Sequence, residues 1–220
     1  MSSTPTAEAM KQIVAAAAPL LKSAGFRKRR HSFNRLVGDG LAHLVNFQMG
    51  LYDPSGRPDV LADIRVNLHG LFTINLGVFV PEMDRQGPPS SSWINDYDCQ
   101  LRKRIGALMP EQNDVWWPLD FEPSQEQAID ALHDVGLPWL GQFTDRQVIL
   151  GKFQTGDVED LGMTPACALD IADLLLGTGK IQAAEQIVRN YLASDEVRRP
   201  HRDHVEDEYL ELRNLRHLLD

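Results

Sequence analysis

Phe72-Thr-Ile-Asn-Leu-Gly-Val-Phe-Val-Pro81 is the stretch that decides the fold, because polar and apolar residues alternate along it. Side chains alternate across a β-strand, so Thr73, Asn75 and Gly77 fall on one side and the opposite side is apolar throughout. Pro81 has no N–H to donate and ends the pairing. The stretch therefore predicts a central strand with one face packed on a core. The residues of that face are Phe72, Ile74, Leu76, Val78 and Val80.

Other strands are expected to precede the central one. Residues 41–51 alternate in the same way, with Asn46 and Gln48 on the side away from the core, and residues 26–37 and 60–67 also have strand character. The glycines of Gly38-Asp-Gly40 indicate a turn. Sequential strands joined by short connections predict an antiparallel meander. Residues 82–98 are expected to form a surface loop, residues 99–109 fit a strand or a helix, and residues 115–118 fit a short edge strand.

Helices are expected at both ends of the chain. Residues 6–24 carry an apolar stripe at helical spacing, and Pro19 is expected to kink that helix or mark a restart. Ser124 is expected to cap a helix that Gly136 closes, residues 164–193 fit a helical hairpin, and a last helix begins near residue 203. The fold class predicted is α+β: an N-terminal helix packed on an antiparallel sheet, followed by a helical C-terminal section. Residues 1–122 and 123–220 are the two expected parts.

Composition narrows the class of protein. Hydrophobic residues make up 43% of 220, which is enough for a core. The two cysteines, Cys99 and Cys167, form no Cys-x-x-Cys pair, which favours a reduced cytoplasmic location. No apolar run approaches the ~18 residues of a membrane span. The net charge of −9 divides into +4 for residues 1–110 and −13 for residues 111–220, so a charged partner is a fair hypothesis.

Three groups of residues are candidates for binding. Asn46, Gln48, Thr73 and Asn75 share the polar side of the predicted sheet and form either a ligand surface or an ordinary solvated face. The basic run Arg27, Lys28, Arg29 and Arg30 could hold phosphates, joined by Arg102 and Arg104 if the two strands are neighbours; the alternative is a solvated basic strand. Glu206, Asp207 and Glu208 could face a basic protein.

Signals for metal or catalytic chemistry are weak. His201 and His204 are metal-capable, but their segment is uniformly charged and is better interpreted as a solvated helix start, so no metal or cofactor is expected. Trp116 and Trp117, with tryptophans 93 and 139, could form an aromatic platform, although buried core positions are the commoner use. No nucleophile elbow, zinc-protease helix or P-loop is present, which favours a protein without enzymatic activity.

Several short motifs resemble a known family. The chain contains, in this order, Pro19-Leu-Leu-Lys22, Gly25-Phe-Arg-Lys28, Phe33-Asn-Arg35, Val45-Asn-Phe-Gln48, Phe72-Thr-Ile-Asn-Leu-Gly-Val78, Arg102-Lys-Arg-Ile-Gly106 and Trp116-Trp117. Together they resemble the bacterial domain-of-unknown-function family DUF4304 over residues 10–120. The long connection over residues 53–70 departs from the family pattern. The resemblance implies a bacterial cytosolic α+β domain with no established activity, and it supplies no catalytic residues.

The sequence therefore favours a non-catalytic, protein-binding role for this chain. The first hypothesis is a basic protein partner for the acidic C-terminal half. An immunity-type role is suggested only by analogy with other small bacterial proteins of this sort. Nucleic-acid binding through the basic run is the alternative, and an enzyme of unrecognised type is the third.

Overall fold

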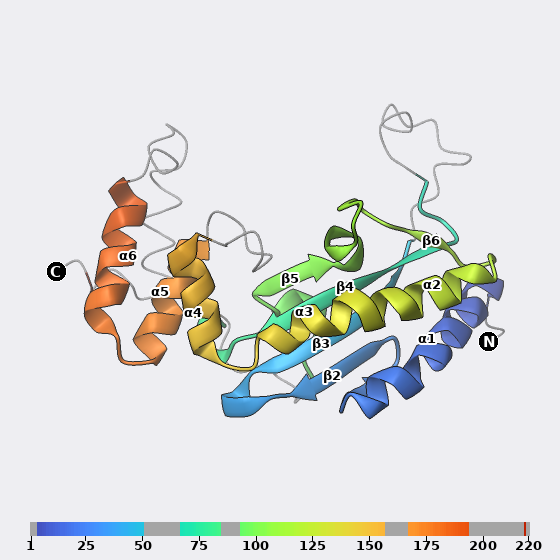
Figure 1. Cartoon of the computed structure of the whole chain (residues 1–220), viewed down its shortest axis with the longest axis horizontal. Coiled ribbons are helices and arrows are strands. Elements are labelled where there is room, and N and C mark those ends of the chain that lie inside the picture. The colour runs from blue at the N-terminus through green and yellow to red at the C-terminus, as the bar shows by residue number, and fades with distance from the viewer. Residues whose placement is uncertain (1–3, 51–66, 85–92, 157–166, 194–217, 219–220) are drawn as a thin grey trace.

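The computed structural model describes residues 4–50, 67–84, 93–156, 167–193 and 218. Their strands form an antiparallel sheet in which neighbours along the chain are neighbours in space, in the order β1-β2-β3-β4-β5 (Figure 1). The short strand β6 pairs with the beginning of β4. The predicted α+β class and the antiparallel meander are confirmed. The strands are β1 (Arg27–Arg29), β2 (Ser32–Leu36), β3 (Ala42–Met49), β4 (Leu71–Phe79), β5 (Leu101–Arg104) and β6 (Trp117–Pro118).

The strand β4 lies inside the sheet, between β3 and β5. The side chains predicted for its apolar face are all buried in one core, whereas Asn75 on the opposite face stays half-exposed. Pro81 opens a short 3-10 turn, Pro81–Met83, directly after the strand. Residues 72–79 thus form most of the central strand, as predicted.

The helix α1 (Pro5–Ser23) begins with a cap, because the Thr4 hydroxyl accepts a hydrogen bond from the Ala7 N–H at 3.3 Å. Its predicted apolar stripe packs on the sheet, with Met10 and Leu21 fully buried. Of the two alternatives predicted for Pro19, the restart is wrong, because one helix runs through this residue. Pro19 lies on the exposed side, where the carbonyl that loses its N–H partner can turn to water.

A second long helical segment lies beside α1 on the same face of the sheet (Figure 1). It comprises α2 (Pro123–Ala131), a π-helical turn (Leu132–Gly136) and α3 (Leu137–Gln142). The predicted end at Gly136 is wrong, because Gly136 packs closely on Ile105 and Leu76 and the segment continues past it. The predicted Ser124 cap is also wrong, since the helix begins at Pro123 and the Ser124 hydroxyl is buried without a hydrogen-bond partner.

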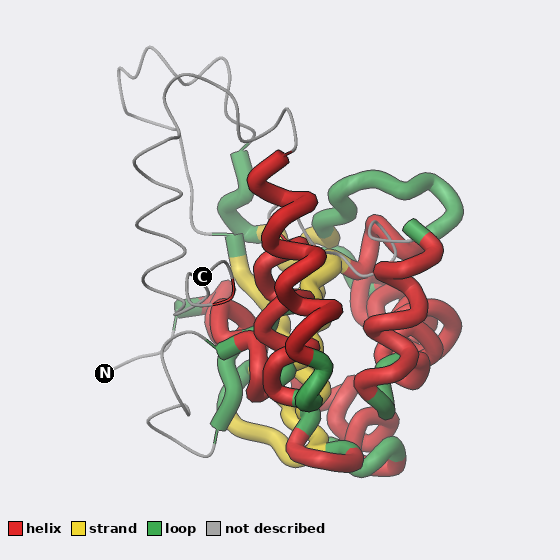
Figure 2. Tube along the Cα trace, turned by 90° about the vertical axis from the view of Figure 1, so that its left-hand side faces the viewer, coloured by secondary structure: helices red, strands yellow, loops and turns green. Residues whose placement is uncertain are grey.

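Three further helices stand at one end of the sheet, and Figure 2 views the molecule from that end. They are α4 (Arg146–Thr155), α5 (Cys167–Gly177) and α6 (Ile181–Ala193). The close packing of α5 on α6 confirms the predicted hairpin within the described residues. Arg146 pairs with Glu82 at 2.7 Å, and a Cβ on Gly177 would lie 2.3 Å from the Glu82 side chain, so Glu82 joins α4 and α5 to the end of β4.

The remaining predictions for connecting segments have mixed outcomes. Residues 99–109 form β5 and then a 3-10 turn, and the edge strand expected near residue 115 is β6. Ile94 and Cys99 are buried against the sheet, so this part of the expected surface loop is packed. The strand expected over residues 60–67 and the helix expected after residue 203 fall almost entirely outside the described residues. None of the helices in the described part combines the length and hydrophobicity that a membrane span requires.

Candidate functional site

A row of polar side chains crosses the sheet face opposite the described helices. Ser32 of β2 lies opposite Asn46 of β3, which in turn lies opposite Asn75 of β4. Asn75 lies opposite Arg104 of β5, and Arg29 of β1 lies opposite Ser32. Residues that oppose one another in an antiparallel ladder project from the same face. The row therefore runs across five strands and has an arginine at each end.

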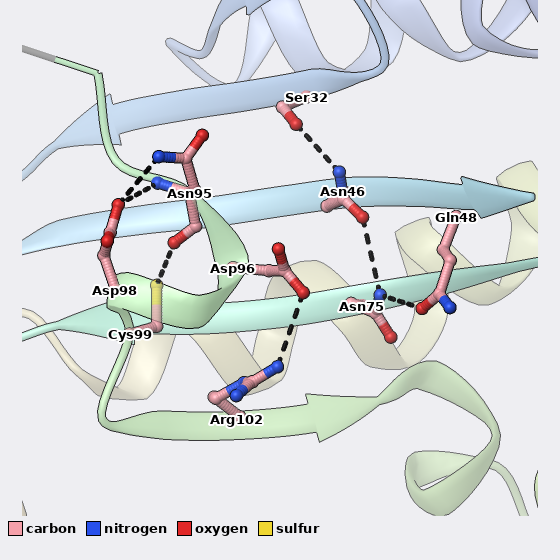
Figure 3. A network of polar contacts seen from close by, with 9 residues as sticks. All are labelled: Ser32, Asn46, Gln48, Asn75, Asn95, Asp96, Asp98, Cys99 and Arg102. Atoms are coloured by element: carbon pink, nitrogen blue, oxygen red, sulfur yellow. Dashed lines mark hydrogen bonds and ion pairs between the residues drawn. The ribbon is translucent and has the colours of Figure 1, made fainter. Parts of the chain in front are cut away.

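The centre of this row is an amide network, which we call the amide row and define as Ser32, Asn46, Gln48 and Asn75 (Figure 3). The Asn46 side-chain amide donates to the Ser32 hydroxyl at 2.8 Å. The Asn75 amide donates to the Gln48 carbonyl oxygen at 2.8 Å and to that of Asn46 at 3.4 Å. The Asn75 carbonyl oxygen and the Gln48 amide nitrogen are left without a partner among the described residues. One acceptor and one donor thus remain for a ligand.

Both ends of the polar face are covered by chain. At one end the Asn34 amide donates to the Ile94 carbonyl at 3.0 Å, and Ile94 and Cys99 pack on the sheet. At the other end the Thr73 hydroxyl donates to the Val115 carbonyl at 2.8 Å. Thr73, predicted as a ligand contact, is fully buried and holds this connection in place. The amide row is the part of the face that the described segments leave open.

The basic run forms a hairpin beside the amide row, and we call residues 27–32 the basic hairpin. Its register places Arg27 and Arg29 on the polar face, opposite Asn34 and Ser32. Lys28 points the other way and lies 5.9 Å from the Phe33 ring centroid. The four cationic side chains of the hairpin are exposed, and no described carboxylate forms an ion pair with any of them. Within the part of the chain that the structure describes, the β1 edge of the sheet therefore carries uncompensated positive charge.

An open groove of about 1460 Å³ follows this edge from the polar face round to α1. Its lining includes Lys11 and Lys22 of α1 in addition to the hairpin, and none of the described residues that line it is acidic. Partial burial, followed by the charges of Lys28, Arg30 and Lys11, lowers the pKa of His31 below its ordinary value. Burial is the largest cause of this shift, and the neighbouring cations add to it. The lining also includes side chains of the polar face and of the loop before β5: Ser32, Asn46, Gln48, Trp93, Asn95 and Tyr97.

The turn of the basic hairpin has an unusual backbone. Arg30 has φ of 55°, which is the left-handed region that favours glycine or asparagine. An L-residue there is disfavoured by about 1–2 kcal/mol. The local conformation therefore disfavours arginine at a position where its side chain adds to the groove.

Replacing Arg30 with glycine is expected to raise the free energy of unfolding by about 0.5–1 kcal/mol, because glycine accepts positive φ and loses only part of that gain to chain entropy. Urea unfolding measures the change. Arg29→Gly, in the extended part of the same hairpin, is the matched control and should lower the free energy of unfolding by a similar amount. A loss of stability in both variants would contradict strain at Arg30.

The cations of β5 differ from those of the hairpin. The sheet order places three strands between β5 and β1. The two basic segments are therefore not neighbours, although the sequence hypothesis required them to be. Arg102 pairs with Asp96 at 3.4 Å, and Arg104 pairs with Asp114 while lying 5.0 Å from the Trp116 ring centroid. The far edge of the face is therefore charge-compensated, and free positive charge is concentrated on the basic hairpin.

The tryptophans do not form one platform. Trp117 and Trp139 are buried in the core, as the commoner interpretation predicted. Trp93 and Trp116 are half-buried at opposite edges of the polar face, and each lies near an arginine. Arg29 is 5.9 Å from the Trp93 ring centroid, and Arg104 is 5.0 Å from that of Trp116. Tyr97, which no periodicity marked, is 72% exposed beside the groove. The sequence analysis missed Ser32 as a residue of the polar face. The sequence could have indicated it, because Ser32 and the apolar Phe33 are adjacent in a strand and therefore project from opposite faces.

Other candidate chemistry finds little support in the described residues. They contain no group of three or more His, Cys, Asp or Glu side chains placed to hold a metal ion. Burial raises the pKa of the Cys99 thiol well above its ordinary value, so this thiol stays protonated and is a poor nucleophile. Glu206, Asp207, Glu208 and the histidines 201 and 204 lie outside the described residues.

The fold and this face together define an α+β protein whose sheet has one helix-covered face and one polar, partly open face. Residues 65–142 match the model of a family described as a domain of unknown function (DUF4304). The resemblance to this family is confirmed for that stretch, which runs from just before β4 to the end of α3 and crosses the boundary expected after residue 122. No curated protein and no solved structure matches the chain.

Proposed function

We propose that this protein is a non-catalytic binding protein, and that its partner is an anionic macromolecule that docks on the basic hairpin and the amide row. One observation carries the proposal: four exposed cations without described ion-pair partners lie beside the open part of the polar sheet face. Phosphate or carboxylate groups of a partner would pair with these cations. The amide row would supply hydrogen bonds that fix its position.

The chemistry of the described side chains supports binding over catalysis. Among the described residues, His43 and Cys99 have strongly shifted pKa values, and both side chains are buried. Both ring nitrogens of His43 are already hydrogen-bonded, to Arg35 and to the Phe143 carbonyl. A general base must reach a substrate proton, and neither group lies on the groove.

A cytosolic location and a protein partner for the acidic C-terminal segment remain part of the proposal. The cysteine usage supports the location. The charge of −13 over residues 111–220 supports a second, acidic surface that includes Glu206, Asp207 and Glu208.

Retention on immobilised heparin tests the proposed function, because heparin offers dense negative charge and no bases. A protein of net charge −9 should be retained at low salt only if its cations are clustered. We expect the wild-type protein to bind in 50 mM NaCl and Arg27→Glu/Arg29→Glu to pass through the column. Lys180→Glu/Arg189→Glu changes the net charge equally on the α5–α6 hairpin and should elute with the wild type. An unretained wild-type protein, or a hairpin variant that elutes with it, would overturn the proposal.

A further inference from the structure

We infer that the anionic partner is a single-stranded nucleic acid, with its phosphates on the basic hairpin and its bases over the amide row. The inference rests on the proposed function and deepens it by naming the class of partner. Three features carry it: the shape of the groove, the type of its cations, and the groups that lie beside them.

The shape suits an extended chain. The groove is open and continues from the polar face round the edge strand β1 to α1, instead of enclosing a small ligand. The amide row reaches from β2 to β4, and the whole sheet from β1 to β5 covers four strand spacings of ~4.8 Å, or ~19 Å. Single strands are bound along such grooves, at sites of about 4 nucleotides or more.

The cations suit phosphate. Three of the four cationic side chains of the basic hairpin are arginines, whose planar guanidinium groups pair with phosphate in a bidentate way. Arg30 is kept at a positive φ that glycine would adopt with less strain. The described part of the groove lining carries no acidic side chain that would repel a polyanion. These features favour a regularly charged backbone as the ligand.

The neighbouring groups suit unpaired bases. Tyr97 is 72% exposed beside the groove, so its aromatic ring is available for base stacking, and Trp93 lines the same groove next to Arg29. The Gln48 amide nitrogen and the Asn75 carbonyl oxygen can donate to and accept from base edges. An acidic peptide would use the cations but has no planar bases for the rings. The combination therefore favours nucleic acid over an acidic protein.

Fluorescence polarisation with the full-length chain tests the inference. The probes are a labelled 12-nucleotide RNA and DNA of mixed sequence, each single-stranded and annealed to its complement, with polyglutamate as competitor. We expect at least one single strand to bind about 10-fold more tightly than its duplex. Binding should weaken from 50 to 200 mM NaCl, with a slope of about −2 to −3 in log K against log salt for three to four contacted phosphates.

Substitutions separate charge from stacking. Arg27→Glu/Arg29→Glu is expected to weaken single-strand binding at least about 30-fold, and Tyr97→Ala about 5- to 10-fold, because base stacking on an aromatic ring contributes in that range. Both sets change exposed side chains, and unchanged thermal unfolding would confirm that the fold is intact. Lys180→Glu/Arg189→Glu is the charge-matched control and should bind as the wild type does.

The outcomes distinguish the inference from the proposed function. Retention on heparin without single-strand binding would overturn the inference and leave the function standing. Displacement of the oligonucleotide by polyglutamate at equal charge concentration would identify an acidic protein as the partner and would also overturn the inference. Equal affinity for single strand and duplex, or an unaffected Tyr97→Ala variant, would refute base stacking. Absence of binding to heparin and to every oligonucleotide would refute both the inference and the proposed function.

Discussion

Acidification from pH 7 to pH 4 is expected to remove about 3 kcal/mol of folding free energy through one side chain, His43. This residue projects from β3 into the core and is fully buried. The Arg35 guanidinium lies 2.8 Å from its Nδ1 and can only donate, so Nδ1 accepts and the ring is neutral with its proton on Nε2. The Nε2–H donates to the Phe143 carbonyl at 2.8 Å. Protonation would place a second charge beside Arg35 in the core.

Burial lowers the pKa of His43 to about 4; the hydrogen bond to Phe143 opposes this shift, and the charge of Arg35 adds to it. An unfolded histidine titrates near 6.5. Above pH 6.5 the ring is neutral in both states and stability is complete. As the pH falls from 6.5 to 4 the unfolded chain binds a proton that the folded protein does not, so the free energy of unfolding decreases. The difference between a pKa near 6.5 in the unfolded chain and about 4 in the folded protein corresponds to ~3 kcal/mol.

Urea unfolding at pH 7.5, 6, 5 and 4 measures this loss. His43→Gln offers a similar donor and acceptor without titrating, so its stability should fall less over the same range, and the difference between the two curves isolates His43. His31, whose pKa is also lowered, is removed from the comparison by a His31→Gln background. If wild type and His43→Gln lose the same free energy down to pH 4, the assigned neutral state of His43 is wrong.

Gly77→Ala is expected to lower the free energy of unfolding by about 2 kcal/mol, although the change adds only one methyl group. Gly77 lies on the polar side of β4, and a Cβ at this position would lie 2.6 Å from the Cys99 Sγ. Overfilling a packed core in this way typically costs about 1–3 kcal/mol. The contact matters for the candidate site, because Cys99 and Ile94 fasten the segment that covers one end of the polar face.

Chemical denaturation of four variants tests the contact. Gly141→Ala is the matched control: its Cβ would meet nothing within 4 Å on α3, so it should raise stability by up to about 1 kcal/mol. Cys99→Gly removes the opposing side chain, and the double variant Gly77→Ala/Cys99→Gly should lose at least about 1 kcal/mol less than the two single losses together. Strict additivity would show that Gly77 and Cys99 do not compete for the same space.

Alternation along the strands was sufficient to predict much of the sheet. Residues 72–80 carry a period of two so regular that only one register buries their apolar face. The same rule assigned Asn46, Gln48 and Asn75 to one face before any contact between them was known. The helix end predicted at Gly136 failed because local propensity is weak beside tertiary packing, and Gly136 packs on Ile105 and Leu76.

The sequence by itself determined the α+β class, the central strand and the side of the sheet on which each strand residue lies, because side-chain direction follows from backbone geometry. Only the tertiary structure decided which candidates meet. The strand order places β5 away from the basic hairpin. Asp96 and Asp114 form ion pairs with the two β5 arginines. Thr73 is buried, and its hydroxyl donates to the Val115 carbonyl. These outcomes depend on contacts between residues distant along the chain, and the periodicity of a single segment carries no information about them.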